Sequence, residues 1–286
     1  MSLPIAAPRS TAGLVLGRRI GLIAATVISC IFIGGVLGGA TMLGPLAGNT
    51  DFAARSLPPS LDHPFGTDPF GRDVFVRTLQ GLALSLKIGL IAAMVSSIVA
   101  LVLAIVATTF GRLADMVVSF LVDAVMGLPH LVLLVLICFA LGGGPSAVVF
   151  SVAVTHWPRL TRILRAEVLQ VMTSDYVRTS RRFGMSWWHI STRHLLPHLF
   201  PQMIVGTLLL FPHAILHEAG LTFLGFGLEP SKPAIGIMLA DSMRYLTAGY
   251  WWLGLFPGAA LVALVLTFDG IASGASALLS PRESQD

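Results

Sequence analysis

Residues 85–108 read SLKIGLIAAMVSSIVALVLAIVAT, and this stretch decides the fold class. Lys87 is its one charged residue, and every other position is apolar, small or hydroxyl-bearing. The hydrocarbon core of a bilayer is about 30 Å thick, so roughly 20 predominantly apolar residues in a helix span it. The stretch is therefore predicted to be a transmembrane helix.

The composition of the whole chain supports a membrane protein. Of its 286 residues, 55% are hydrophobic and 11% are charged, and the mean hydropathy is +0.84. Soluble domains carry about 25% charged residues, so a water-soluble domain, a disordered chain, a collagen and a coiled coil are excluded. A net charge of +4 does not indicate a nucleic-acid-binding face, and no nucleic-acid partner is expected. The expected surroundings are the lipid bilayer.

Five further segments are apolar enough to span, or nearly so: 20–42, 116–141, 146–165, 199–218 and 249–272. The fold class predicted is all-α, a polytopic membrane protein with about six transmembrane helices. The first span is too long for a cleaved signal peptide. Polar residues and prolines interrupt several spans, which indicates helices packed in a bundle rather than surrounded by lipid. These interruptions are Asp123, Pro129, His130, His156, Pro158 and Pro212.

The orientation follows from the basic residues in the connections. With the N-terminus in the cytoplasm, 12 of the 18 Lys and Arg residues lie on the cytoplasmic side, as the positive-inside rule requires. Both termini are therefore predicted to be cytoplasmic. The predicted divisions are a cytoplasmic segment 1–19, the first helix 20–42, an external loop 43–84, a core of five helices 85–272 that includes a cytoplasmic loop 166–198, and a cytoplasmic tail 273–286. The external loop is expected to carry a short amphipathic helix.

The cytoplasmic loop is patterned rather than featureless. Asp175 suits a helix N-cap, and Gly184 stands where a C-cap ends a helix of two to three turns. A second helical stretch then runs to Leu195-Leu196-Pro197. Tyr, Phe and Trp side chains between them fit a groove on another protein, whereas Arg together with Trp also fits the inner leaflet of the membrane. The residues alone leave both interpretations open.

The external loop contains His63-Pro64-Phe65-Gly66-Thr67-Asp68-Pro69-Phe70-Gly71-Arg72-Asp73-Val74. Gly66 and Gly71 permit tight turns, while Asp68, Arg72 and Asp73 supply opposite charges. Two interpretations are open: a charged cluster that contacts a partner outside the membrane, or an ordered loop that only covers the bundle. Thr67 is expected to be accessible from the external side.

Both loops resemble one known family. Gly184 and Leu195-Leu196-Pro197 are similar to the coupling loop of ABC importer permeases, although Arg178-Thr179-Ser180 stands where that family has Glu-Ala-Ala. Residues 63–73 resemble the H-x-x-G-T-D-x-x-G-R-D signature of the peptide/nickel branch. Residues 219–227, Trp251-Trp252 and Pro257-Gly258 extend the resemblance, and 269–281 depart from it.

The resemblance implies a type I, MetI-like permease subunit of the bacterial cytoplasmic (inner) membrane, which transports by alternating access and catalyses no reaction. It implies four kinds of partner: a second homologous permease, two ATPase subunits, an extracytoplasmic substrate-binding protein and the lipid bilayer. ATP and magnesium are expected in the ATPase subunits and no cofactor in this chain, because neither Lys87 nor Lys232 follows a glycine, as a phosphate-binding loop requires. The residues implied for ATPase coupling are Tyr176, Val177, Arg178, Thr179, Ser180, Arg181, Phe183, Gly184 and Pro197; those of the external signature are Gly66, Thr67, Asp68, Gly71, Arg72 and Asp73.

Ionisable residues inside the spans mark the substrate path. The candidates are His156, His213, His217, Glu218 and Asp123, and the three histidines are also the candidate transient metal ligands. Imidazole suits nickel, zinc and copper, and His213-Ala214-Ile215-Leu216-His217 with His156-Trp157 resembles the nickel branch. Nickel, free or chelated, is therefore the predicted substrate, with di- or oligopeptides as the alternative.

Two other classes of function account for fewer of these sequence features than an importer permease does. An intramembrane metalloenzyme is a lower alternative, because Glu218 follows His217 and the H-E-x-x-H spacing is absent. An ion-coupled secondary transporter leaves the coupling-loop pattern unexplained and lacks inverted repeats.

Overall fold

The structure is a computed structural model that describes residues 11–229 and 232–279, with side chains for 21–229 and 232–276. The described chain is almost entirely helical, apart from an isolated antiparallel bridge between Thr67 and Asp73. The helices are α1 (Thr11–Leu43), α2 (Val74–Thr109), α3 (Arg112–Met126), α4 (His130–Ala140), α5 (Gly144–Met172), α6 (Asp175–Arg182), α7 (Trp187–Ile190), α8 (Leu196–Phe223), α9 (Ile235–Tyr245) and α10 (Trp252–Leu279). Short turns of other helix types lie at Gly44–Leu46, Phe52–Ala54, Ser191–Leu195 and Leu246–Ala248.

Fewer helices qualify as membrane spans than the six predicted. Within the described residues, four are long and apolar enough, namely Gly21–Leu46, Val74–Thr109, Trp187–Phe223 and Trp252–Ser276. The pair α3 and α4 makes a fifth if it is one bent span. The remaining predicted span lies in α5, which has 29 residues and includes polar positions such as His156 and Thr161.

The predicted span 116–141 is broken in the structure. α3 ends at Met126, α4 begins at His130, and the two helices differ in direction by 95°. Pro129 lies between them, has no N–H to donate, and disfavours helical geometry at the preceding residue. The break places His130 at the first position of a new helix.

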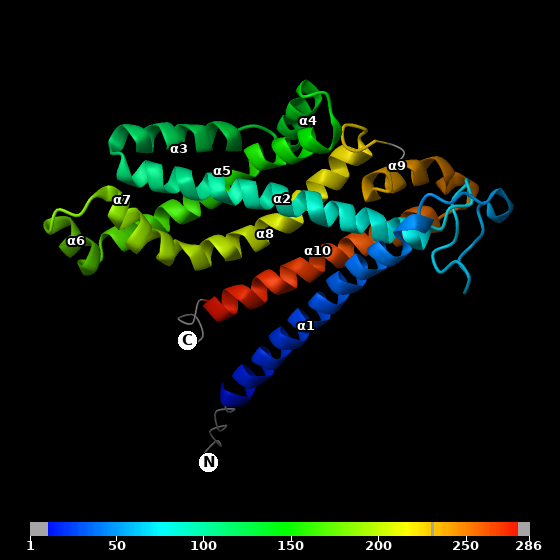
Figure 1. The fold of residues 1–286 in the computed structure, drawn as a ribbon, viewed down its shortest axis with the longest axis horizontal. Helices are drawn as coiled ribbons and strands as arrows, with labels where there is room; N and C mark the ends of the chain where they lie inside the picture. The colour runs from blue at the N-terminus through cyan, green and yellow to red at the C-terminus, as the bar shows by residue number, and fades with distance from the viewer. Residues whose placement is uncertain (1–10, 230–231, 280–286) are drawn as a thin grey trace, which may run out of the picture.

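α2 is the centre of the bundle and packs most extensively against α5 and α8 (Figure 1). Its buried face is rich in small residues, including Ala92, Ala93, Ser96, Ala100 and Ala104. Small side chains let helix backbones approach closely in a membrane, where lipid is as apolar as leucine. α1 and α10 pair with one another along the other flank of the bundle.

The non-spanning segments gather at opposite ends of the bundle. α6 and α7 lie at the left end of Figure 1, and the segment between α1 and α2 lies at the right end beside α9. This segment ends at Asp73 rather than residue 84, and its helical content is two short 3-10 turns instead of the expected amphipathic helix. α10 likewise continues to Leu279, past the predicted end at 272, and residues 1–10 and 280–286 of the predicted termini lie outside the described residues.

The contact of α9 with α8 depends on a glycine. A Cβ atom on Gly236 would lie 2.7 Å from the Thr222 Cβ and 2.8 Å from the Phe223 backbone N. We expect Gly236→Ala to destabilise the purified protein by about 1–3 kcal/mol, the usual cost of an overpacked core. Gly220→Ala in α8 is the control, because a Cβ there meets open space. Thermal unfolding followed by size-exclusion chromatography measures both; equal stability of the two variants would contradict the close contact.

Candidate functional site

The turn after α6 has the geometry of a Schellman motif. Gly184 has φ +74°, its N–H donates to the Arg181 carbonyl at 3.0 Å, and the Met185 N–H donates to the Ser180 carbonyl at 3.1 Å. A positive φ suits glycine because it has no Cβ. The predicted helix end is therefore present, although the N-cap is Ser174, and Asp175 lies in the first turn.

α6 and α7 bury few side chains and expose aromatic ones. Val177 is fully buried against the bundle, whereas Phe183 and Trp188 are 78% and 79% exposed. Tyr176 is also exposed, and the Arg181 guanidinium lies over the Trp187 ring at 4.4 Å. Of the other predicted coupling residues, Arg178, Thr179 and Pro197 are exposed, and the Ser180 hydroxyl contacts His194 Nε2 at 2.9 Å. Exposed aromatic groups around a short fixed helix form a surface suited to docking.

At the opposite end, Asp68 organises the segment before α2. Its carboxylate accepts hydrogen bonds from the backbone N–H groups of Phe70 and Arg72, each at 2.9 Å, and from Arg72 Nε at 2.6 Å. Arg77, which is 3% exposed, lies with its Nε 3.9 Å from the same carboxylate. The Asp68 charge is therefore compensated by two guanidinium groups.

The rest of the external signature is also structural. Asp73 caps α2 by accepting from the Val76 N–H at 3.0 Å, and its other oxygen lies 2.8 Å from His63 Nδ1. Gly66 and Gly71 have φ of +72° and +75°, and a Cβ on Gly71 would collide with the Asp51 carbonyl. Thr67 is fully buried and donates to the Ala54 carbonyl at 2.5 Å. The expectation that Thr67 is accessible is wrong, because its hydroxyl closes this turn.

A cavity of about 340 Å³ lies beside this segment. Its lining includes Asp68, Arg72 and Arg77 together with Asp241 and Arg244 of α9. The cavity is therefore lined by charges of both signs at the end of the bundle away from α6.

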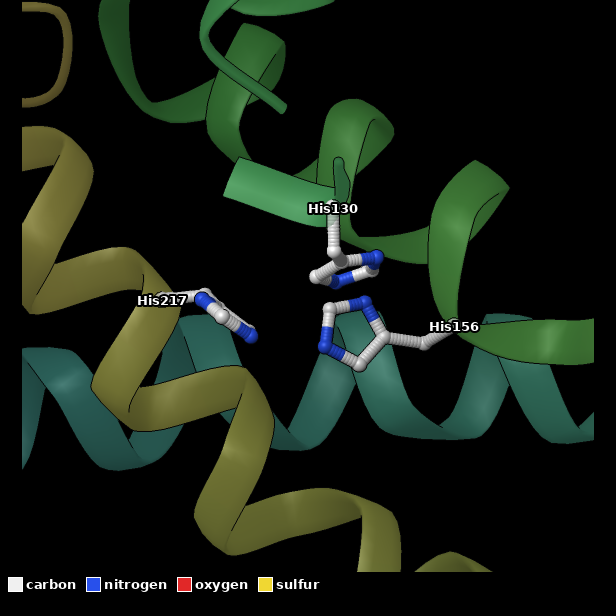
Figure 2. A group of neighbouring side chains, drawn as sticks. All are labelled: His130, His156 and His217. Atoms are coloured by element: carbon white, nitrogen blue, oxygen red, sulfur yellow. The ribbon is translucent and has the colours of Figure 1, made fainter. Parts of the chain in front are cut away.

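The predicted substrate-path residues separate into three environments. Glu218 is fully buried between α8 and α2, where it accepts hydrogen bonds from the Ser85 hydroxyl at 2.6 Å and the Thr222 hydroxyl at 3.1 Å. Asp123 is exposed and pairs with Arg162 of α5. The third environment holds the histidines: His156 and His217 converge with His130, whereas His213 is exposed and outside that group (Figure 2).

Sequence reasoning missed several of these residues. Asp115 of α3 makes two contacts with the Arg165 guanidinium of α5, at 2.6 and 2.7 Å. His130 was recognised as an interruption of a span but not as a neighbour of the other histidines. These pairs are far apart in sequence, and only the packing of α3 and α4 on α5 brings them together.

The arrangement defines a multi-pass helical membrane protein with exposed aromatic side chains at one end and a charged, ordered segment at the other. The family described as binding-protein-dependent transport system inner membrane component matches residues 96–285, and the chain belongs to this family. Its helical architecture is that of a type I ABC importer permease.

Named relatives agree with this family. The chain is 33% identical over 228 residues to the dipeptide transport system permease protein DppC of Bacillus subtilis (strain 168), covering 80% of this chain and 71% of that protein. It is 38% identical over 233 residues to a putative peptide transport system permease protein of Brucella suis biovar 1 (strain 1330), covering 82% and 78%. A solved structure of an amino acid ABC transporter with histidines has a TM-score of 0.53 at 20% identity, covering 72% of this chain and 94% of that one.

The Asp68 network generates a testable expectation. Asp68→Ala leaves the nearly buried Arg77 without its closest carboxylate, and breaking a buried ion pair typically costs about 3–5 kcal/mol. We expect faster proteolysis between α1 and α2 in membrane vesicles that are opened so that the protease reaches both faces. Asp62→Ala is the control, because Asp62 is an exposed acid in the same segment. Identical cleavage rates in the two variants would show that Asp68 does not hold the segment together.

Proposed function

We propose that the chain is one permease subunit of an ABC importer that moves di- or oligopeptides into the cytoplasm. The supporting observation is the similarity to two relatives that are named as peptide permeases. Each alignment covers about four-fifths of this chain and more than two-thirds of the relative. In this proposal a second permease completes the pathway, two ATPase subunits supply energy, and an extracytoplasmic protein delivers the substrate. ATP and magnesium belong to the ATPase subunits.

Peptides replace nickel as the proposed substrate. The nickel hypothesis rested on a resemblance to the nickel branch and named His156, His213 and His217 as transient ligands, of which the structure groups His156 and His217 with His130 instead of His213. The names of the relatives favour the peptide alternative. The external signature does not discriminate between peptide and nickel as substrates, because Asp68, Asp73 and Thr67 make contacts within the chain itself.

The coupling step is proposed to use α6 and α7. Phe183 and Trp188 project from the bundle and would enter a cleft on one ATPase subunit. Residues Trp187–Phe223 form one continuous helical stretch, so a displacement at α7 would be transmitted into α8 without an intervening loop. ATP binding changes the equilibrium between inward- and outward-facing states only through its different affinity for them.

The proposed orientation places α6 in the cytoplasm and the segment between α1 and α2 outside. Arg178, Arg181, Arg182 and Arg193 cluster at the α6 end, in agreement with the positive-inside rule. The start of α1 and the end of α10 both lie in the half of the bundle nearer to α6 (Figure 1). In this proposal the protein lies in the inner membrane, and both of its termini are on the cytoplasmic side.

Gly184→Pro tests function and coupling together. Proline cannot adopt the φ of +74° or donate to the Arg181 carbonyl, so the Schellman turn should be lost. We expect uptake of a labelled dipeptide to fall to the level of cells lacking this chain, while the abundance of the chain in the membrane is unchanged. Labelled nickel is measured in parallel.

Gly249→Pro is the matched control, because Gly249 has φ +91°, donates to the Leu246 carbonyl and lies at the opposite end of the bundle. Normal dipeptide uptake in the Gly184 variant would overturn the coupling role. Nickel uptake that depends on this chain, without dipeptide uptake, would overturn the peptide assignment.

Leu61→Cys tests the orientation. Leu61 is fully exposed in the segment between α1 and α2, unlike the buried Thr67. In a Cys30→Ala background, which removes the exposed native cysteine, we expect a membrane-impermeant maleimide to label the variant in spheroplasts with intact inner membranes. Thr67→Cys should remain unlabelled. Labelling of Leu61→Cys only after membrane disruption would reverse the orientation.

A further inference from the structure

Three histidines from three helices meet inside the bundle. His130 begins α4, His156 lies in the middle of α5, and His217 lies on α8, with their rings turned toward one another (Figure 2). The ring centroids are 4.7 Å apart for His130 and His156, 4.8 Å for His130 and His217, and 5.1 Å for His156 and His217. One ring nitrogen from each residue lies within 4.8 Å of the other two.

The hydrogen bonds of His156 determine which nitrogen is free. Its Nδ1 lies 2.9 Å from the Val152 carbonyl oxygen. A carbonyl only accepts, so Nδ1 carries the proton, and in the neutral ring Nε2 has the lone pair. Nε2 is buried and has no hydrogen-bond partner among the described residues. A backbone carbonyl on the second nitrogen is the arrangement that orients metal-ligating histidines.

We propose that His130, His156 and His217 bind one divalent transition-metal ion. Imidazole nitrogen is a preferred ligand for zinc, nickel and copper, whereas magnesium and calcium require oxygen. Three protein ligands leave one position of a tetrahedral ion open, as in sites that exchange water or substrate. This inference does not depend on whether the cargo is a peptide.

Binding an ion requires the three ring nitrogens to come closer together than they are in the structure. Metal–nitrogen bonds of 2.0–2.1 Å place tetrahedral ligand atoms about 3.3 Å apart, so the nitrogens must approach by up to about 1.5 Å. His156 is held by its carbonyl contact and is 8% exposed, while His130 and His217 are partly exposed. The latter two are therefore the rings with room to adjust.

Glu218 does not compete for the role of ligand. Although it follows His217, both of its oxygens accept hydrogen bonds from Ser85 and Thr222 on the side facing α2. The site therefore offers neutral nitrogen donors alone. An ion bound there joins α4, α5 and α8, and it stabilises the conformation in which these helices converge.

The test is metal binding by the full-length chain, purified with its co-expressed partner subunits in lipid nanodiscs and without a polyhistidine tag. Zn²⁺ and Ni²⁺ are titrated calorimetrically, and Mg²⁺ serves as the reference ion. We expect one equivalent of Zn²⁺ or Ni²⁺ per chain. His130→Ala and His156→Ala should each weaken binding by at least the ~10–100-fold that loss of an outer-sphere partner costs.

Two controls separate ligation from misfolding and from surface binding. His213→Ala removes an exposed histidine one turn from His217 and should leave the affinity unchanged. His130→Cys retains a zinc ligand and should restore Zn²⁺ binding relative to His130→Ala. Co²⁺ should give the absorption bands of a tetrahedral site in the native chain. No binding beyond that of Mg²⁺, or binding that survives loss of His156, would overturn the proposal.

Discussion

The need to bury the polar positions of α5 is the constraint on which the rest of the structure depends. This helix carries His156, Pro158 and Thr161 at buried positions near its middle, and polar groups without hydrogen-bond partners are costly in a bilayer. α2 and α8 cover its polar side, and α3 and α4 also pack against it, while Phe150, Val154 and Ile163 remain exposed. The small residues on the buried face of α2 allow neighbouring helices to approach closely, and the Asp115–Arg165 contact joins α3 to α5. The polar interior follows from this requirement, while the bend between α3 and α4 follows from Pro129.

Packing against the bundle fixes the segments at both of its ends. Val177 fixes α6 to the bundle while its exposed neighbours face outward, and the Asp68 network fixes the opposite segment in the same way. Each end is thus a rigid surface attached to helices that cross between them. The proposed coupling would use this arrangement, because a displacement at α6 would reach the opposite end through these helices.

The sequence predicted what depends on short-range chemistry. Gly184 was correctly identified as a helix end because a positive φ favours glycine, and the apolar stretch 85–108 lies within α2. Contacts between residues that are far apart in the sequence were not predictable from such local chemistry. His130 joins His156 only because Pro129 turns the chain, and hydropathy, which averages over a window, does not detect that bend. Thr67 looked like an accessible loop residue, but it is buried by contacts with residues 10 to 13 positions earlier. The substrate was not predictable from local sequence patterns, since permeases for peptides and for nickel share the same signatures.

The π-helical turn Ser191–Leu195 sets the angular register of α8. Its defining bond runs from the Leu196 N–H to the Ser191 carbonyl, five residues apart, so the turn contains one residue more than an α-helical turn. One residue corresponds to about 100° of rotation in an α-helix of 3.6 residues per turn. Every side chain of α8 is therefore rotated by that angle from where a regular helix beginning at Trp187 would direct it. Glu218 meets Ser85, and His217 meets His156, only in this rotated register. The length of a short turn near one membrane face thus determines which side chains α8 directs into the interior of the bundle more than 20 residues later.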